Sequence, residues 1–198
     1  MNTANKLTLL RVVMIPLFLL VLYLDVPGAN YWALAIFVIA SLTDTLDGYI
    51  ARHYNQTTDF GKFMDPLADK ILVISALICF VSLDLINPWW VLVIVAREFL
   101  VTSLRLVAAD EGVVIAANKW GKAKTVSQIV AIALILVMQY VQELVAMGVL
   151  SAFTMGGLPS SAIFLWAGDG LMAITVFFTV LSGGIYLKQN WKVIGNSK

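Results

Sequence analysis

The sequence has few charged residues and almost no histidine or cysteine. Only 13% of its 198 residues are charged, and it contains one histidine and one cysteine. A single cysteine, Cys79, excludes an internal disulfide, and its apolar surroundings favour a small buried side chain. No P-loop is present, because Gly121-Lys122 is followed by Ala123 rather than by Ser or Thr. Low-complexity linkers and internal repeats are also missing, so one domain over residues 1–198 is predicted.

Hydrophobic residues dominate what is present. They make up 61% of the chain, with a mean hydropathy of +0.90, whereas a soluble domain is about 45–50% apolar. Six apolar segments approach or exceed the roughly 20 residues that a membrane-spanning helix needs. They run over residues 8–24, 31–52, 66–86, 88–110, 122–145 and 161–188. We therefore predict an all-α, polytopic membrane protein with six transmembrane helices.

Lysine and arginine indicate the orientation of these helices. The connections that follow the first, third and fifth segments contain neither residue, and only Arg97 lies in the middle of a segment. The others flank the remaining connections and the chain ends: Lys6, Arg11, Arg52, Lys62, Lys70, Arg105, Lys119, Lys122, Lys124, Lys188, Lys192 and Lys198. Because positive charge stays on the cytoplasmic side, both termini are predicted to be cytoplasmic.

Four aspartates lie at the cytoplasmic ends of the second and third segments. Asp44 lies about 20 Å along the second segment at 1.5 Å per residue, with Asp47 one turn further, and Asp65 and Asp69 open the third. Carboxylates at a membrane are costly, so such a cluster predicts a functional site. Carboxylate oxygens are the ligands that Mg²⁺ and Mn²⁺ prefer, and four of them predict a pair of divalent cations on the cytoplasmic side.

The spacing of these aspartates favours one shared site. On a helix, residues three or four apart share a face, which applies to Asp44 with Asp47 and to Asp65 with Asp69. A connection of about a dozen residues would join two antiparallel helices, so the two faces can meet. Pro66 is typical of a first helical turn, which would place Asp65 at a helix N-terminus. Two metals about 3.5–4 Å apart suit displacement at phosphorus.

Each part of the pattern also has an ordinary structural explanation. An aspartate near a helix end can be a cap, a glycine such as Gly48 or Gly61 can serve packing, and Arg52 can simply mark the membrane boundary. The joint spacing is harder to explain in this way. It reads D-x₂-D-G-x₂-A-R-x₈-G-x₃-D-x₃-D, with eight fixed residues over 26 positions from Asp44 to Asp69.

This string resembles the signature of the CDP-alcohol phosphatidyltransferase family, at every fixed position. The resemblance implies a homodimeric membrane enzyme that moves a phosphatidyl or phosphoalcohol group from a CDP-linked donor to a hydroxyl and releases CMP. It also implies that Asp44, Asp47 and Asp65 bind one metal, and that Asp44, Asp65 and Asp69 bind the other. Asp69 would be the general base. The CDP-lipid pocket would be lined by Asp47, Gly48, Ala51, Arg52 and Gly61.

Further segments resemble one branch of that family, which uses sn-glycerol 3-phosphate as acceptor. They are Asn5–Arg11, Gly61–Lys70, Arg97–Arg105, Val114–Thr125, and Ser182-Gly183 with Tyr186. The resemblance implies CDP-diacylglycerol as donor, phosphatidylglycerophosphate and CMP as products, and a bacterial inner membrane as location. Nucleic acid is not an expected partner.

Glycerol 3-phosphate is a dianion, so its site needs cationic side chains. The candidates for binding its phosphate are Arg11, Arg97, Arg105, Lys122 and Lys124. Lys122 and Lys124 flank one alanine, so on a helix they point in different directions and only one is expected to face the site. Arg97 has a structural alternative, which is pairing with Glu98. Asp25, Asp84 and Glu143 are interpreted as structural, and Asp169 has no evident partner in the sequence.

The predicted reaction is a single displacement, since no activated serine, cysteine or histidine accompanies the cluster. Three alternatives stay open. Another acceptor such as inositol phosphate, serine or phosphatidylglycerol would keep the chemistry, although the basic candidates favour a phosphorylated one. A divalent-cation transporter could also use intramembrane aspartates, but it would more often show inverted repeats. A non-catalytic scaffold would leave the acidic cluster unexplained.

Overall fold

The computed structural model describes residues 3–53, 59–110, 112–113 and 119–191, and side chains only outside 3–6, 44–53, 59–66, 69 and 110. Within these residues the chain forms six long helices and one short hairpin. The helices are α1 (Thr3–Leu22), α2 (Ala29–His53), α3 (Asp59–Ser82), α4 (Pro88–Asp110), α5 (Lys119–Ala146) and α6 (Ser160–Gln189). The hairpin consists of β1 (Thr154–Met155) and β2 (Leu158–Pro159). The six predicted helical segments are confirmed, with bounds that differ by a few residues.

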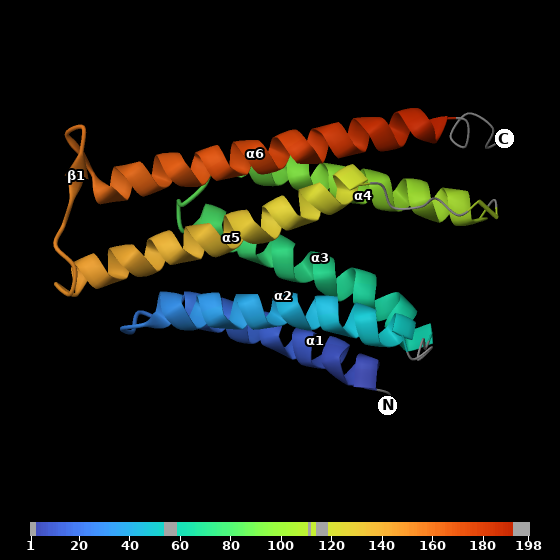
Figure 1. Ribbon diagram of the computed structural model, residues 1–198, viewed down its shortest axis with the longest axis horizontal. Helices are drawn as coiled ribbons and strands as arrows, with labels where there is room; N and C mark the ends of the chain where they lie inside the picture. The colour runs from blue at the N-terminus through green and yellow to red at the C-terminus, as the bar shows by residue number, and fades with distance from the viewer. Residues whose placement is uncertain (1–2, 54–58, 111, 114–118, 192–198) are drawn as a thin grey trace.

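The helices form one elongated bundle (Figure 1). Helix α1 packs against α2 and α3, α5 packs against α2 and α6, and α4 packs against α6. We call the end where α1 begins and α6 ends the terminal end, and the opposite end, which carries β1 and β2, the hairpin end. Helix α2 finishes and α3 starts at the terminal end, so the aspartate-bearing segments lie together there (Figure 1).

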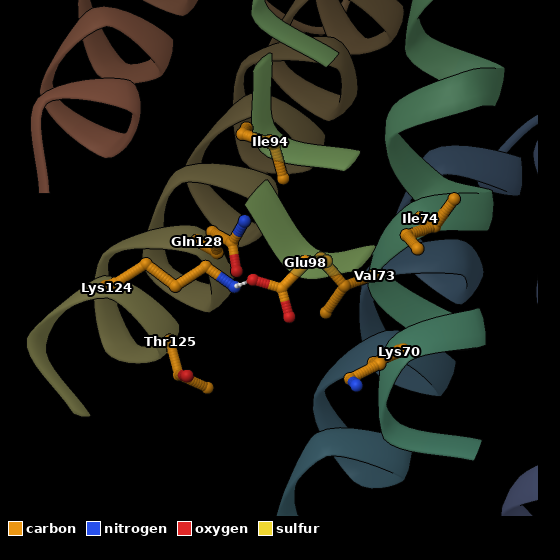
Figure 2. Close-up of a pocket in the computed structure, with 8 residues that line it drawn as sticks. All are labelled: Lys70, Val73, Ile74, Ile94, Glu98, Lys124, Thr125 and Gln128. Atoms are coloured by element: carbon orange, nitrogen blue, oxygen red, sulfur yellow. Dashed lines mark hydrogen bonds and ion pairs between the residues drawn. The ribbon is translucent and has the colours of Figure 1, made fainter. Parts of the chain in front are cut away.

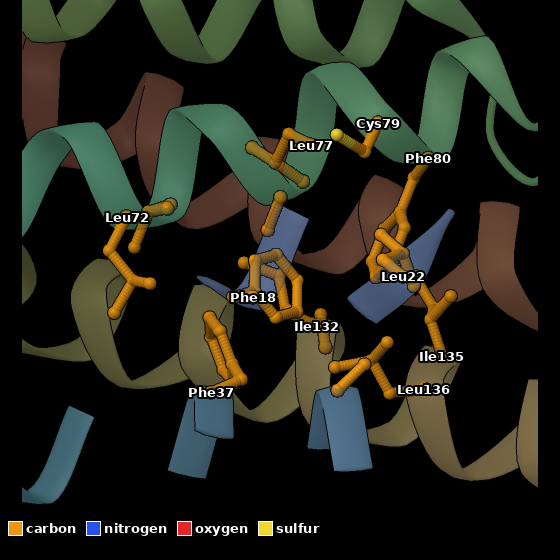
Figure 3. Close-up of a cluster of buried hydrophobic side chains, with 14 of the residues drawn as sticks. Phe18, Leu22, Phe37, Leu72, Leu77, Cys79, Phe80, Ile132, Ile135 and Leu136 are labelled. Atoms are coloured by element: carbon orange, nitrogen blue, oxygen red, sulfur yellow. The ribbon is translucent and has the colours of Figure 1, made fainter. Parts of the chain in front are cut away.

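Large aromatic and aliphatic side chains fill the centre of the bundle (Figure 3). Phe18 of α1 and Phe37 of α2 are fully buried, with ring centroids 5.9 Å apart. Phe80 of α3 and Leu136 of α5 are also fully buried in this cluster. Close packing of this kind fixes the relative positions of the four helices, because interiors tolerate few voids.

The outer surface is apolar as well. Trp166 is 74% exposed, Leu106 69% and Phe177 63%, and such wide apolar exposure is typical of a surface that faces lipid rather than water. Helices α5 and α6 are each long and apolar enough to cross a membrane, and shorter apolar stretches occupy Leu7–Leu22, Ala29–Thr43 and Lys70–Ser82 within the described residues. The apolar sequence of α4 is interrupted by charged residues, among them Arg97 and Glu98.

Two local features differ from the sequence prediction. Helix α3 begins at Asp59, so Asp65 lies in its second turn and not at its N-terminus. The bounds of α2 and α3 are therefore closer in the sequence than the dozen residues that were predicted to separate them. Hydropathy misses this start because charged residues interrupt the first turns of α3 and the continuous apolar run begins only after them. The hairpin was also not predicted; its turn uses Gly156 and Gly157, whose φ angles of 61° and 81° suit a two-residue turn.

Candidate active site

The eight signature positions are divided between two helices. Positions 44, 47, 48, 51 and 52 lie in α2, and positions 61, 65 and 69 lie in α3. Both stretches are helical, so Asp44 and Asp47 are three residues apart on α2 and Asp65 and Asp69 are four apart on α3, as the spacing argument assumed. That the two faces form one site stays a prediction. The side chains of all eight lie outside the described residues. Among the side chains that are described, no group of three or more His, Cys, Asp or Glu could hold a metal ion.

Helix α1 places polar side chains beside these two helices. Thr8 is 1% exposed and Arg11 is fully buried, and both lie in the half of α1 nearest the terminal end. A guanidinium that is completely removed from solvent must be held by other polar groups. Arg11 was predicted to be a phosphate ligand, and the structure places it inside the protein, on the helix that packs against both α2 and α3.

A cluster of four polar side chains joins α4, α5 and α6, and we call it the α4 polar cluster: Arg97, Glu98, Lys124 and Ser182. Glu98 accepts hydrogen bonds at Oε1 from Arg97 Nη1, at 2.9 Å, and from Lys124 Nζ. Arg97 Nη2 donates to Ser182 Oγ at 2.9 Å. The side chains of Arg97 and Glu98 are each 14% exposed. One carboxylate therefore neutralises part of the charge of two nearly buried cations.

Gly183 allows Arg97 to pass close to α6. A Cβ atom added at Gly183 would lie 3.1 Å from Arg97 Cγ and 3.7 Å from Nε. The 3.1 Å contact is tighter than ordinary packing, so the Arg97 side chain would have to shift if a larger residue replaced Gly183. The Nε atom of Arg97 is buried without a hydrogen-bond partner in the described part of the chain.

A small cavity lies between this cluster and α3 (Figure 2). It measures about 30 Å³ and its polar lining comes from Lys70, Glu98, Lys124, Thr125 and Gln128. That volume holds a water molecule and is too small for a glycerol phosphate. Gln128 is 3% exposed, and its Nε2 atom has no partner among the described residues. Lys70 Nζ donates to Thr102 Oγ1 of α4, which holds the lysine against α4.

Arg105 lies two turns beyond Glu98 on α4 and is held by α6. Its Nε atom donates to the hydroxyl of Tyr186 at 2.9 Å, and its guanidinium carbon lies 5.5 Å from the centroid of the Tyr186 ring. Arg105 is exposed, whereas Tyr186 is only 2% exposed. The Arg105 guanidinium is therefore held at the surface by the hydroxyl of a buried tyrosine.

The structure separates the two neighbouring lysines of α5. Lys124 is 5% exposed and reaches Glu98, while Lys122 is exposed. The sequence predicted that only one of them faces the acceptor site, and the structure shows Lys124 in the interior and Lys122 at the surface. The sequence alone assigned no role to Lys70, Ser182 or Tyr186. A contact between helices that are distant in the chain leaves no pattern in a single sequence. Glu98 was considered only as a partner of Arg97.

Two acidic side chains near the hairpin end have structural roles. Asp169 Oδ1 accepts from the Asn87 backbone N–H at 3.2 Å and from Trp90 Nε1 at 2.8 Å, which supplies the partners that the sequence did not reveal. Glu143 accepts from the backbone N–H groups of Gly28 and Asn30 and from Asn30 Nδ2. Its interpretation as structural is confirmed, because it satisfies backbone donors at the start of α2.

The sequence pattern of the CDP-alcohol phosphatidyltransferases matches residues 1–181. The chain belongs to the CDP-alcohol phosphatidyltransferase family. It is 41% identical over 208 residues to the CDP-diacylglycerol–glycerol-3-phosphate 3-phosphatidyltransferase of Bacillus subtilis (strain 168), covering 99% of this chain and 98% of that protein. It is also 41% identical to a probable phosphatidylglycerophosphate synthase of Mycobacterium tuberculosis (strain H37Rv), over 98% of this chain and 84% of the relative.

A third relative covers a shorter part of the chain. The CDP-diacylglycerol–glycerol-3-phosphate 3-phosphatidyltransferase of Escherichia coli (strain K12) is 41% identical over 141 residues, which is 68% of this chain and 76% of that protein. The family resemblance predicted from the aspartate signature is thereby confirmed, and the protein is a member of a membrane enzyme family.

Proposed function

We propose that this protein transfers the phosphatidyl group of CDP-diacylglycerol to sn-glycerol 3-phosphate, giving phosphatidylglycerophosphate and CMP. The observation that carries the proposal is the 41% identity to the Bacillus subtilis enzyme of that name over 99% of this chain. The eight signature residues, at their spacing, are a second and separate observation that supports the same assignment. The basic side chains of α4 and α5 support a phosphorylated acceptor, because a dianion requires cationic donors.

The proposal places all six helices across a bacterial inner membrane, with both termini and the site on the cytoplasmic side. The terminal end of the bundle supports this arrangement, because α1 begins and α6 ends there (Figure 1). The distribution of lysine and arginine is the second support: the connections at the hairpin end contain neither residue. The protein is further proposed to act as a homodimer, as the family resemblance implies.

Two divalent cations, Mg²⁺ or Mn²⁺, are part of the proposal. Their ligands would be Asp44, Asp47 and Asp65 for one and Asp44, Asp65 and Asp69 for the other. The donor set fits, since all are hard carboxylate oxygens and stand on two helices whose aspartate-bearing segments lie at one end of the bundle. When bound, such cations polarise phosphate oxygens and stabilise charge on a departing phosphate.

The remaining chemistry belongs to the side chains of the chain itself. Asp69 takes the proton of the primary hydroxyl of glycerol 3-phosphate. That oxygen then attacks the phosphorus that bears diacylglycerol, and CMP departs. Arg52 binds the diphosphate, and the small residues Gly48 and Ala51 leave room for the nucleotide beside α2. Asp47 and Gly61 complete the CDP-lipid pocket.

The acceptor phosphate is assigned to side chains near the terminal end of the bundle. Arg105 is the best placed of the described candidates, because it is exposed and its guanidinium is held from one side. Lys124 contributes positive charge from the interior, shared with Glu98. Arg97, Arg11 and Lys122 remain candidates, although Arg97 already has Glu98 and Ser182 as partners and Lys122 points outward.

The test is CMP release by the purified protein in detergent with CDP-diacylglycerol and Mg²⁺ or Mn²⁺. Glycerol 3-phosphate is compared with inositol phosphate, inositol, serine and phosphatidylglycerol. Metal-dependent release with glycerol 3-phosphate alone is the expected result. Release with a different acceptor would reject the proposed acceptor and keep the family reaction, and no release from folded protein would reject the enzyme assignment.

A further inference from the structure

Tyr186 is a buried tyrosine whose hydroxyl meets an exposed arginine. Its side chain is 2% exposed and packs with Val101 and Leu104 of α4. Its backbone carbonyl accepts from Asn190 N at 3.2 Å and from Asn190 Nδ2 at 2.8 Å, where α6 ends. The ring is held by packing against α4, and the backbone is held by the hydrogen bonds from Asn190. The hydroxyl therefore has a fixed position between α4 and α6.

The hydroxyl takes up one particular donor of Arg105. The hydrogen bond runs from Nε, at 2.9 Å, and the guanidinium also lies over the ring, with 5.5 Å between its carbon and the ring centroid. A guanidinium is a rigid planar group with five N–H donors. Occupying Nε leaves the edge formed by Nη1 and Nη2, which has no hydrogen bond to any residue that the structure describes. This edge matches the two oxygens of a phosphate.

We infer that Tyr186 is a positioning residue that fixes the Arg105 guanidinium so that its Nη1–Nη2 edge meets the phosphate of the acceptor. The inference rests on the proposed function, because it assigns that phosphate to Arg105. An arginine on an exposed helix face ordinarily samples many rotamers, and ordering it on binding weakens affinity. Holding the guanidinium in advance removes that penalty for the acceptor and leaves binding of the CDP-lipid unaffected.

A purely structural role is the competing explanation, in which the pair only joins α4 to α6. The two explanations use different parts of the tyrosine. The ring supplies the packing against Val101 and Leu104, and phenylalanine keeps that ring. The hydroxyl alone contacts Nε, so removing it tests positioning while the contact between the helices persists.

The experiment compares Tyr186→Phe with wild-type protein in the CMP-release assay. We expect the KM for glycerol 3-phosphate to rise about fivefold, because the acceptor must then order one long side chain as it binds, while kcat, the KM for CDP-diacylglycerol and the thermal midpoint stay unchanged. The matched control is Tyr140→Phe on α5, whose ring lies 5.6 Å from that of Tyr31 and whose hydroxyl has no hydrogen bond to a described residue. The control should leave all four quantities unchanged.

A double substitution completes the test. Arg105→Ala should raise the KM for glycerol 3-phosphate. Adding Tyr186→Phe should raise it no further, because the tyrosine hydroxyl acts only through the guanidinium that the first change removes. Additive effects, or an unchanged KM in a folded and active Tyr186→Phe protein, would overturn the inference. The proposed function fails separately: wild-type protein that released CMP only with another acceptor would reject glycerol 3-phosphate before any variant is compared.

Discussion

The two ends of the bundle hold their partly buried carboxylates in different ways. Near the hairpin end, Glu143 and Asp169 accept hydrogen bonds from backbone N–H groups at the starts of α2 and α4 and from neutral side chains. In the other half, Glu98 is shared by two cations. Backbone donors and helix N-termini satisfy a carboxylate without any cation, so Glu143 and Asp169 find their hydrogen-bond donors within the fold.

The other half is not balanced in this way. Arg97 and Lys124 share Glu98 there, and Lys70 and Arg105 are held by the hydroxyl groups of Thr102 and Tyr186. Cations held by a shared carboxylate or by neutral hydroxyl groups keep part of their charge for an anion, and a low local dielectric strengthens that attraction. The comparison agrees with the proposal that the phosphate of the acceptor binds in the half of the bundle that carries Glu98. Substitutions of the same kind at the two ends can test this difference.

The largest effect is expected from Asp69→Asn. Loss of a general base lowers turnover by roughly a thousandfold, whereas an amide of the same size should keep part of the CDP-diacylglycerol binding. Turnover and CDP-lipid binding should be measured on the same preparation. Asp169→Asn is the matched control at the hairpin end and should keep wild-type turnover. Loss of lipid binding in parallel with turnover would count against Asp69 as the base.

The next effect concerns Glu98→Gln. This change leaves Arg97 and Lys124 nearly buried without their carboxylate, and removing one partner of a buried ion pair lowers stability by about 3–5 kcal/mol. Thermal unfolding in detergent should therefore shift strongly downward, and the KM for glycerol 3-phosphate should rise because Lys124 loses its fixed position. Glu143→Gln is the control, and its smaller shift should leave the kinetics intact. Equal shifts in both variants would contradict the proposed difference between the two ends.

The smallest effect is expected from Asp169→Ala. The backbone N–H of Asn87 and the indole of Trp90 would lose their acceptor, which lowers stability by about 1–3 kcal/mol. Catalysis should not change, because α6 carries this residue far from the terminal end. Unfolding midpoint and CMP release together check the prediction. A change in the KM for either substrate would show that the hairpin end also shapes the site.

Much of the fold could be predicted because hydropathy is local. Each apolar segment must form its own backbone hydrogen bonds in an apolar medium, so helix number and approximate bounds follow from the chain. The start of α3 at Asp59 was missed for the same reason, since hydropathy marks where a helix is apolar and not where it begins. The two-residue strands are too short to leave a pattern.

The site divides along a similar line. The sequence by itself determined the family, the four aspartates and the approximate location of the basic residues, because their spacing on helices is fixed by helical geometry. Only the tertiary structure decided that Lys124 and not Lys122 points inward, that Asp169 caps α4, and that Glu98 and Tyr186 hold the neighbouring cations. The physical reason is that the contacts of Lys124 with Glu98, of Asn87 with Asp169 and of Arg105 with Tyr186 join residues 26 to 82 positions apart. Helix packing rather than local sequence brings such residues together.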